Sequence, residues 1–225
     1  MPTALVFDLD GTLIDSAPDL HQAVLKVLAE EGRPSITLDE LKTMVGDGAP
    51  ILVRRVFEYV GHDAGAALPD LVARYLAHYE NAIAVHTRLY PGVRETLEHL
   101  KAAGHPMAVC TNKAHKPSVH VLEALDLAKY FDVVVGGDAT PAKKPDPRHV
   151  LTVLERLSVA PAHAVMIGDG ANDLIAARDA GVAVIHARYG YGITREHDVT
   201  PDAVVDAFAA IPASVRAIAE ARRAQ

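Results

Sequence analysis

The chain has 225 residues, 50% of them hydrophobic and 23% charged, a balance that excludes a largely disordered protein and allows a sizeable buried core. Its 22 Lys and Arg against 29 Asp and Glu give a formal net charge of −7, which argues against nucleic acid or an anionic membrane as the main partner. The single cysteine, Cys110, lies in an apolar run, which indicates a buried thiol. The N-terminal residues lack a secretory signal pattern and no apolar run approaches the ~20 residues of a membrane span, so we expect a cytoplasmic protein.

Five short apolar runs predict buried β-strands. Most are rich in β-branched residues and are bounded by Gly, Asp or Pro, a pattern typical of strands that are covered on both faces of a sheet. Helical patterns separate the later runs, and these alternating elements predict an α/β domain with a mostly parallel sheet. The five runs are Ala4–Phe7, Met107–Cys110, Val133–Val135, Ala164–Ile167 and Val182–Ile185.

Residues 16–88, between the first strand and the rest of the sheet, break this alternation. They contain four amphipathic helical patterns and no strand pattern. Thr37, with Glu40 three residues later, forms a capping-box signature for the second of these helices, which we expect to end near Gly46. The segment is therefore expected to fold as a small all-α domain inserted into the α/β domain.

Carboxylates follow three of the predicted strands, at the sheet edge where parallel α/β proteins bind ligands, and two of these strands are followed by a pair of them. Asp8 and Asp10 follow the first strand and point to the same side of extended backbone. Asp169 and Asp173 follow the fourth strand, and a helix that begins near Gly170 would bring them together. Four carboxylates at one edge would repel each other unless a cation lies among them. Oxygen ligands without a His or Cys cluster suit a hard ion such as Mg²⁺.

Three further residues at the same edge are suited to bind an anionic group. Thr111 and Asn112 follow the second strand, and Lys144 lies in the loop after the third. Because a phosphate dianion resists attack by a carboxylate until its charge is neutralised, Mg²⁺ and Lys144 would prepare a phosphate for attack by Asp8. Asp10 is placed to protonate the leaving alcohol and then to activate water.

Each of these motifs also occurs in proteins without any catalytic role. Asp-x-Asp is common in turns and Lys-Pro in solvated loops. The segment Gly168–Gly170 does not match the dinucleotide-binding fingerprint, since residue 173 is Asp instead of Gly. The joint occurrence of the motifs, each near the end of a predicted strand, favours a single catalytic site.

In these residues the sequence resembles the haloacid-dehalogenase-like hydrolases. Asp8–Thr12 is similar to the first motif of the family, Thr111 to the second, Lys144 with the following Pro145 to the third, and Gly168–Asp173 to the fourth. The resemblance covers essentially the whole chain. It implies a Rossmann-like core with a mobile helical cap, the core formed by residues 1–15 and 89–225 and the cap by 16–88.

The resemblance also implies roles for the individual residues. Asp8 would be the nucleophile that forms an aspartyl-phosphate, and Asp10 the acid and base. Mg²⁺ would be bound by Asp8, Asp169 and the backbone carbonyl of Asp10, and Asp173 would support the ion through water or through hydrogen bonds to its ligands. Lys144 would hold the phosphate together with the threonine and asparagine of the second motif.

Three other segments look most like those of bacterial phosphoglycolate phosphatases: Val45–Ala49, Gly136–Asp138 and Tyr189–Gly192. This likeness implies a small phosphorylated metabolite as the partner, with 2-phosphoglycolate as the expected substrate. The carboxylate of that substrate would need a cation from the cap, and Arg55 is the candidate. The alternative for Arg55 is a solvated position on a helix face.

Several other reactions are compatible with such a core. The enzymatic alternatives are a sugar-phosphate phosphatase, a β-phosphoglucomutase-like phosphomutase and a pyrophosphatase. Asp10 argues against a true dehalogenase, and the absence of a motif around Lys26 or Lys42 argues against a phosphonoacetaldehyde hydrolase. The non-enzymatic alternative is a phosphate-accepting signalling receiver. It is disfavoured because receivers carry the acceptor Asp at the end of a middle strand and have no cap, whereas here the Asp pair follows the first strand and a helical insertion comes next. The patterns fit either a monomer or a homodimer.

Overall fold

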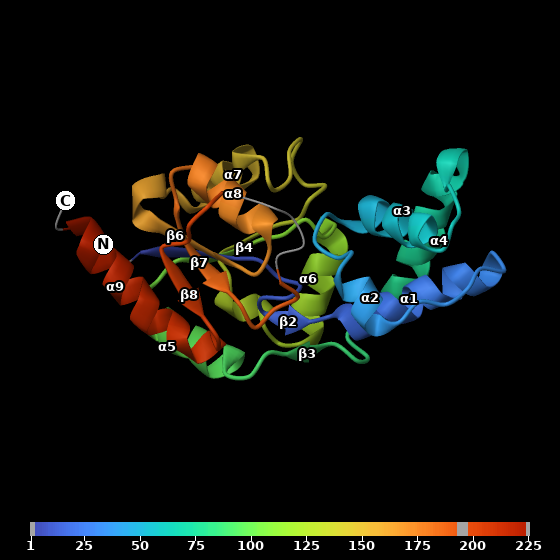
Figure 1. Ribbon diagram of the computed structural model, residues 1–225. Helices are drawn as coiled ribbons and strands as arrows, with labels where there is room; N and C mark the ends of the chain where they lie inside the picture. The colour runs from blue at the N-terminus through green and yellow to red at the C-terminus, as the bar shows by residue number, and fades with distance from the viewer. Residues whose placement is uncertain (1–2, 193–197, 224–225) are drawn as a thin grey trace.

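A parallel six-stranded sheet forms the centre of the molecule (Figure 1). The computed structural model describes residues 3–192 and 198–223. The strand order is β5-β4-β1-β6-β7-β8, and neighbouring strands in this sheet pair in parallel. The six strands are β1 (Ala4–Phe7), β4 (Met107–Cys110), β5 (Val133–Val135), β6 (Ala164–Gly168), β7 (Ala183–Ala187) and β8 (Ala203–Val205).

Strand β1 lies in the middle of the sheet, which explains why its four residues are all buried. Its register places Phe7 opposite Val109 of β4 and opposite Ile167 of β6. Since the strands are parallel, the residues that follow β1, β4 and β6 emerge at the same edge of the sheet. The alternation of side chains along β1 directs Leu5 and Phe7 into one hydrophobic cluster and Ala4 and Val6 into another.

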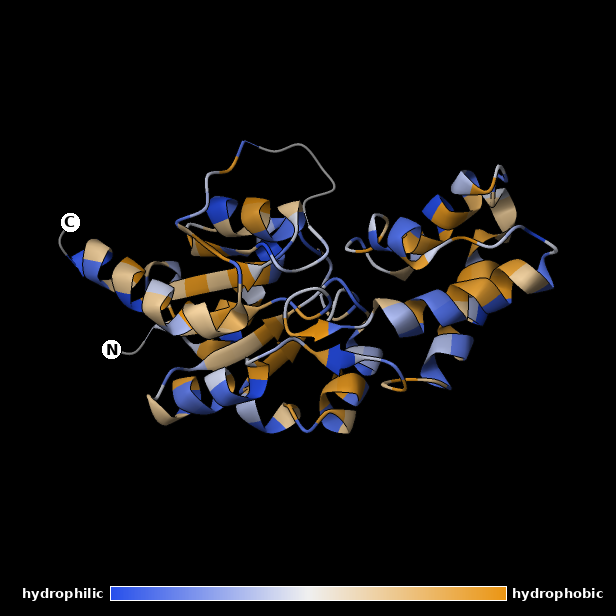
Figure 2. Ribbon diagram, turned by 60° about the horizontal axis from the view of Figure 1, so that its bottom comes forward, coloured by the Kyte–Doolittle hydropathy of each residue, from blue (hydrophilic) through white to orange (hydrophobic). Residues whose placement is uncertain are grey.

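Helices cover both faces of the sheet, and Figure 2 shows apolar strands between helices that are apolar on one side. The cluster around Phe7 includes residues of α5 (Val93–Ala102), α6 (His115–Ala124) and α9 (Ile211–Arg223). The cluster on the opposite face includes residues of α7 (Pro147–Leu157) and α8 (Ala171–Asp179). Short 3₁₀ helices lie between the larger elements, at Gly65–Ala67, Ala128–Tyr130, Pro161–His163 and Phe208–Ala210.

The remaining helices pack together beside the carboxyl ends of the strands (Figure 1). They share a third hydrophobic cluster, separate from the two of the sheet, in which α4 contacts both α1 and α3. The chain enters and leaves this group through the antiparallel pair of β2 (Ile14–Asp15) and β3 (Arg88–Leu89). We propose that the cap comprises residues 16–88, because both crossings lie at this pair. The cap helices are α1 (Ala17–Glu30), α2 (Leu38–Lys42), α3 (Ala49–Tyr59) and α4 (Leu68–Glu80).

The structure confirms the predicted α/β fold and its five strands, and it adds elements that the sequence patterns did not indicate. Strand β7 begins at Ala183 and continues to Ala187. Strands β8, β2 and β3 were not predicted, because β2 and β3 have two residues each and β8 is a partly exposed three-residue strand. Cys110 is buried as expected, and burial raises the pKa of its thiol to about 12. No helix within residues 3–192 and 198–223 is long and apolar enough to cross a membrane.

The second cap helix differs from its prediction at one end. Thr37 and Glu40 form the expected capping box at the start of α2. The helix ends at Lys42, however, and not near Gly46. Gly46 has a φ of +122°, a backbone conformation that an α-helix cannot contain, so the helix cannot extend to this residue. Residues 44–48 instead form a loop, here called the cap loop, that reaches the core.

Candidate active site

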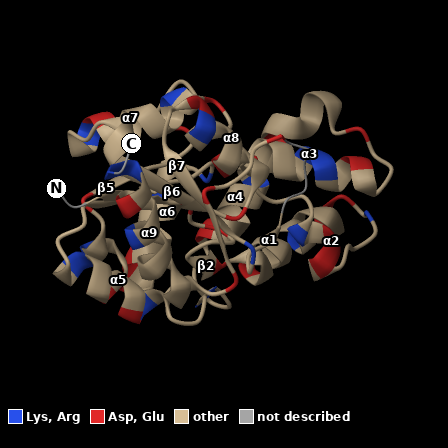
Figure 3. Cartoon of the chain, turned by 60° about the vertical axis from the view of Figure 1, so that its left-hand side comes forward, with Lys and Arg blue, Asp and Glu red and all other residues tan. Residues whose placement is uncertain are grey.

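The predicted site residues meet at the carboxyl edge of the sheet, facing the cap. Asp8 directly follows β1, Thr111 directly follows β4, and Asp169 directly follows β6. Figure 3 shows acidic segments in this region, between the sheet and the cap helices. The parallel topology therefore brings together residues that lie more than 100 positions apart in the sequence.

Three carboxylates form a compact group at this edge. Among the described residues, one carboxylate oxygen from each of Asp8, Asp169 and Asp173 lies within 4.8 Å of the other two. Helix α8 begins at Ala171, so Asp173 lies in its first turn and folds back towards the end of β6. This start agrees with the helix expected near Gly170. Asp173 Oδ2 also accepts a hydrogen bond from the Gly170 amide at 3.0 Å.

Lys144 connects two members of this group. Its Nζ lies 3.0 Å from Asp8 Oδ1 and 2.6 Å from Asp173 Oδ1, and its side chain is only 1% exposed. Burial disfavours the charged form of Lys144, but the two carboxylates outweigh burial and keep its pKa above the usual range. The backbone of Lys144 is also fixed, because its amide donates to His149 Nδ1 and its carbonyl accepts from Asn112 Nδ2.

One lysine does not balance three carboxylates, two of which are buried and one, Asp8, half-buried. Burial, reinforced by Asp173 and opposed by Lys144, raises the pKa of Asp8 to about 7. Burial, reinforced by Asp8 and Asp173, also raises the pKa of Asp169 well above its usual value. The site therefore favours an additional positive charge. All three side chains offer oxygen ligands, so this donor set fits a hard cation such as Mg²⁺.

Asp169 is held by residues from two other parts of the chain. Its Oδ1 accepts a hydrogen bond from the Thr12 hydroxyl, and its Oδ2 accepts one from the Tyr191 amide, both at 2.9 Å. The loop of Tyr191 approaches closely because residue 190 is Gly: a Cβ there would overlap Asp169 and the Gly11 carbonyl. These contacts fix the direction of the carboxylate.

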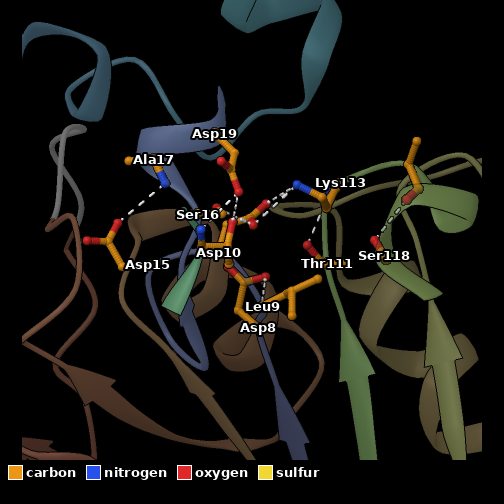
Figure 4. A network of polar contacts seen from close by, with 12 residues as sticks. Asp8, Leu9, Asp10, Asp15, Ser16, Ala17, Asp19, Thr111, Lys113 and Ser118 are labelled. Atoms are coloured by element: carbon orange, nitrogen blue, oxygen red, sulfur yellow. Dashed lines mark hydrogen bonds and ion pairs between the residues drawn. The ribbon is translucent and has the colours of Figure 1, made fainter. Parts of the chain in front are cut away.

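Asp10 lies apart from the group of three carboxylates. It lines the same cavity as the other three carboxylates, as expected, but its side chain is not part of their compact group. Asp10 pairs instead with Lys113, whose Nζ lies 3.2 Å from Asp10 Oδ2, and its Oδ1 accepts a hydrogen bond from the Ser16 hydroxyl at 2.5 Å (Figure 4). Lys113 was not among the predicted site residues. Its position directly after Thr111 and Asn112 was the available signal.

Thr111 and Asn112 occupy different roles in the structure. Thr111 is buried beside Asp8 and Asp10, and its hydroxyl oxygen accepts a hydrogen bond from the Lys113 amide at 3.2 Å. The side-chain amide of Asn112 donates to the Gly46 carbonyl at 2.9 Å and to the Lys144 carbonyl at 2.8 Å. Asn112 thus joins the cap loop to the backbone of the buried lysine.

Arg55 lies at the edge of the same cleft, where it binds the cap loop. Its Nη2 forms an ion pair with Asp47 Oδ2 at 2.6 Å, and its Nη1 donates to the Met44 carbonyl. Asp47 Oδ1 in turn accepts a hydrogen bond from Asn172 Nδ2 at 2.8 Å. The guanidinium and the core asparagine therefore hold Asp47 from both sides.

Two adjoining cavities share Asp8, Asp10, Val45 and Gly46 in their walls. The first, here called the acidic cavity, is lined by polar residues that include Asp47, Arg55, Lys144, Asp169 and Asp173. The second, here called the cap cavity, is lined mainly by apolar and aromatic cap residues, together with Thr111, Asn112 and Lys113. Asp8 and Asp10 thus lie at the junction between a polar and an apolar space.

A parallel α/β core with a carboxylate centre at its carboxyl edge, covered by an inserted group of helices, defines a hydrolase-like enzyme with a cap. A family model described as "Haloacid dehalogenase-like hydrolase" matches residues 5–187. The chain belongs to this family, as its motifs indicated. It is therefore an enzyme, a hydrolase.

Relatives and solved structures agree with this assignment. The chain is 38% identical to a phosphoglycolate phosphatase of Agrobacterium fabrum, over 92% of this chain and 89% of the relative. A crystal structure of a predicted phosphoglycolate phosphatase from Haemophilus somnus is 31% identical, with a TM-score of 0.88 over 94% of this chain and 97% of the other. CbbY from Rhodobacter sphaeroides, in complex with phosphate, is 27% identical, with a TM-score of 0.78 over 96% and 100%.

Proposed function

We propose that this enzyme is a Mg²⁺-dependent phosphatase that hydrolyses a small phosphomonoester, 2-phosphoglycolate, through a phosphoryl group carried by Asp8. The observation that carries the proposal is the contact of Asp8 with Lys144 inside a group of three carboxylates. It combines a nucleophile, a fixed cation and a set of oxygen ligands in one place. The names of the relatives support the same chemistry.

The metal ion would be held by Asp8, Asp169 and the backbone carbonyl of Asp10, with Asp173 in a supporting position. The bound Mg²⁺ would supply positive charge against the phosphate oxygens and the carboxylates. Asp169 is suited to this task because Thr12 and the Tyr191 amide already fix its direction. Asp173 is suited to the supporting task because both its oxygens accept hydrogen bonds from the protein.

Asp8 would act as the nucleophile. Its carboxylate oxygen forms a bond to phosphorus while the bond from phosphorus to the ester oxygen breaks. Lys144 holds Asp8 Oδ1 at 3.0 Å and places its charge where the negative charge of the phosphoryl group develops. The Thr111 hydroxyl, buried at the same edge, would donate a hydrogen bond to a phosphate oxygen.

Asp10 would move the protons. In the first step it gives a proton to the departing ester oxygen. In the second it takes a proton from the water that attacks phosphorus, while the bond from phosphorus to Asp8 breaks and returns the Asp8 carboxylate. The hydroxyl of Ser16 and the ammonium of Lys113 hold its carboxylate in one orientation. Asp10 also lines both cavities, so it reaches the place where phosphate and leaving group separate.

A phosphate-release panel tests this proposal. The panel compares 2-phosphoglycolate with sugar phosphates, nucleotides and pyrophosphate, each with Mg²⁺ and with EDTA. We expect the highest kcat/KM with 2-phosphoglycolate and no release with EDTA or with Asp8→Asn. A preference for another ester would replace the substrate, whereas full activity of Asp8→Asn would contradict the mechanism.

A further inference from the structure

We propose that Lys113 Nζ and the Tyr79 hydroxyl form a subsite in the cap cavity for the carboxylate of the substrate's leaving group. This inference rests on the proposed phosphatase function and deepens it, since it assigns the residues that select an acidic ester over a neutral one. The preference for an acidic ester would then come from Lys113 of the core and Tyr79 of the cap.

Lys113 lies where the core meets the cap. Its ammonium contacts both oxygens of Asp10 at 3.2 and 3.3 Å and lies 4.3 Å from the centre of the Tyr79 ring. Figure 4 shows the side chain pointing from the end of β4 towards Asp10. An ammonium has three hydrogens, so two contacts to Asp10 leave one, which interacts with Tyr79 on the cavity wall.

The surroundings of Lys113 make an anion the suitable ligand. Among the described residues that line the cap cavity, Lys113 is the only cation, and the two anions, Asp8 and Asp10, lie where the cavity joins the acidic cavity. The cap contributes mostly apolar and aromatic side chains to the wall: Leu20, Val45, Ala49, Leu52, Tyr75, Leu76 and Tyr79. Such a wall offers few hydrogen bonds to the hydroxyl groups of a sugar, but it strengthens the attraction between one cation and one anionic group.

Tyr79, beside the same lysine, supplies a second indication of a ligand. The residue is 2% exposed, and within residues 3–192 and 198–223 its hydroxyl interacts with Lys113 but completes no regular hydrogen bond. A buried hydroxyl without a regular hydrogen bond is costly, and a carboxylate oxygen in the cavity would satisfy it. Lys113 and Tyr79 would then each donate to the bound carboxylate.

The chemistry of a two-carbon ester requires the subsite to lie near Asp10. The carboxylate of glycolate is only one carbon away from the ester oxygen that Asp10 protonates. A recognising group must therefore lie beside Asp10, as Lys113 does. Arg55, the cation predicted for this role, lines the acidic cavity and forms an ion pair with Asp47. It is therefore the alternative carboxylate-binding residue against which Lys113 must be tested.

The experiment measures KM and kcat for 2-phosphoglycolate and for 2-hydroxyethyl phosphate, which replaces the carboxylate with a neutral hydroxymethyl group. For Lys113→Met we expect KM for 2-phosphoglycolate to rise about 10- to 100-fold. KM for the neutral ester is expected to change by less than about twofold, while kcat falls for both because Asp10 loses its partner. Tyr79→Phe, which keeps the ring, is expected to raise KM for 2-phosphoglycolate about 5- to 10-fold.

Matched variants separate this role from others. Lys113→Arg keeps the charge and is expected to recover part of the preference for the acidic ester. Lys116→Met removes an exposed lysine nearby and is expected to change neither KM. The subsite would be overturned if the ratio of KM for 2-phosphoglycolate to KM for 2-hydroxyethyl phosphate stayed unchanged in both Lys113→Met and Tyr79→Phe. It would also be overturned if Arg55→Met alone raised KM for 2-phosphoglycolate and not KM for the neutral ester.

A binding measurement distinguishes failure of the subsite from failure of the proposed function. Calorimetry with glycolate and with ethylene glycol, in the presence of Mg²⁺ and inorganic phosphate, requires no turnover. We expect glycolate to bind to the wild-type enzyme and to bind more weakly to Lys113→Met. Equal, negligible binding of both alcohols would overturn the subsite. Glycolate binding without phosphate release from any ester would overturn the proposed function alone.

Discussion

Asp173 Oδ1 accepts a hydrogen bond from Lys144 Nζ at 2.6 Å, and the two side chains are only 2% and 1% exposed. An ion pair this well buried is little screened by solvent, and removal of one partner leaves an uncompensated charge. The same ammonium also contacts Asp8. A single lysine therefore fixes the proposed nucleophile relative to the first turn of α8.

Lys144→Met is expected to reduce kcat for phosphate release by about 100- to 1,000-fold, because it removes a fixed positive charge beside the reacting phosphoryl group. It is also expected to lower the free energy of unfolding by about 3 kcal/mol, since Asp8 and Asp173 lose their buried partner. Steady-state kinetics and urea unfolding measure the two effects.

The adjacent lysine provides the control. Lys143 Nζ donates to the Asp47 carbonyl at 2.7 Å and makes no contact with the three carboxylates among the described residues. Lys143→Met loses one such hydrogen bond, worth about 1 kcal/mol, and kcat should stay within about tenfold of wild type. Equal losses of kcat in both variants would contradict the role assigned to Lys144.

Two glycines at the junction of β6 and α8 are expected to differ in their tolerance of alanine. A Cβ on Gly168 would overlap the carboxyl carbon of Asp173, so Gly168→Ala must displace this side chain. A misplacement of this kind is expected to lower kcat/KM by about 100-fold. A Cβ on Gly170 would lie 3.6 Å from Asp173 Oδ2, an ordinary contact, so Gly170→Ala should keep most of the activity. Similar kinetics in the two variants would contradict this packing.

Stabilisation by Mg²⁺ is expected to depend on pH. Burial raises the pKa of Asp8 from 3.8 to about 7, so at intermediate pH the folded chain holds a proton that the unfolded chain releases. This carboxyl therefore lowers the free energy of unfolding as the pH rises towards 7, and a cation that binds its ionised form reverses the loss. The increase of Tm on addition of Mg²⁺ should be larger at about pH 7.5 than at about pH 5.

Asp169→Asn tests whether this increase comes from the carboxylate group. The variant removes one of the charges that repel each other and one oxygen ligand. Its Tm in EDTA is expected to depend less on pH, and Mg²⁺ should raise its Tm less than that of the wild type. A Tm increase of the wild type that is equal at both pH values would contradict the account.

The cap loop is expected to loosen when its contact with α8 is removed. Asn172 Nδ2 donates to Asp47 Oδ1 at 2.8 Å and to the Gly46 carbonyl at 3.2 Å. Asn172→Ala should therefore increase hydrogen exchange of residues 44–48 and raise KM about 3- to 10-fold. Asn81→Ala, at the exposed end of α4, is the matched control. Unchanged exchange in the cap loop would show that the contact does not hold it.

The positions of the main strands and of most site residues were predictable because their signals are local. Each buried strand has its own apolar run, and Asp8 and Asp169 directly follow two of them. The close approach of Asp169 and Asp173 follows from helical spacing once α8 begins at Ala171.

The remaining contacts depend on distant parts of the chain. Lys113 and Asp10 are separated by 103 positions, and nothing in either neighbourhood indicates that they pair. The contact of the Tyr191 amide with Asp169 uses a backbone group, which almost every residue type has, so the sequence does not indicate it. The carbonyls of the cap loop accept hydrogen bonds from Asn112 and Lys143 of the core, and such packing cannot be inferred from the sequence of the loop.

The central claim is that Asp8 carries the phosphoryl group during turnover, and its direct test is to trap that group. The enzyme is mixed with 2-phosphoglycolate and Mg²⁺, quenched with acid within one turnover, digested and examined by mass spectrometry, with Lys144→Met and Asp8→Asn in parallel. The account predicts one phosphoryl group on the peptide that contains Asp8 in the wild type, and none in Asp8→Asn. A phosphoryl group on another residue, or phosphate release by Asp8→Asn at the wild-type rate, would contradict it.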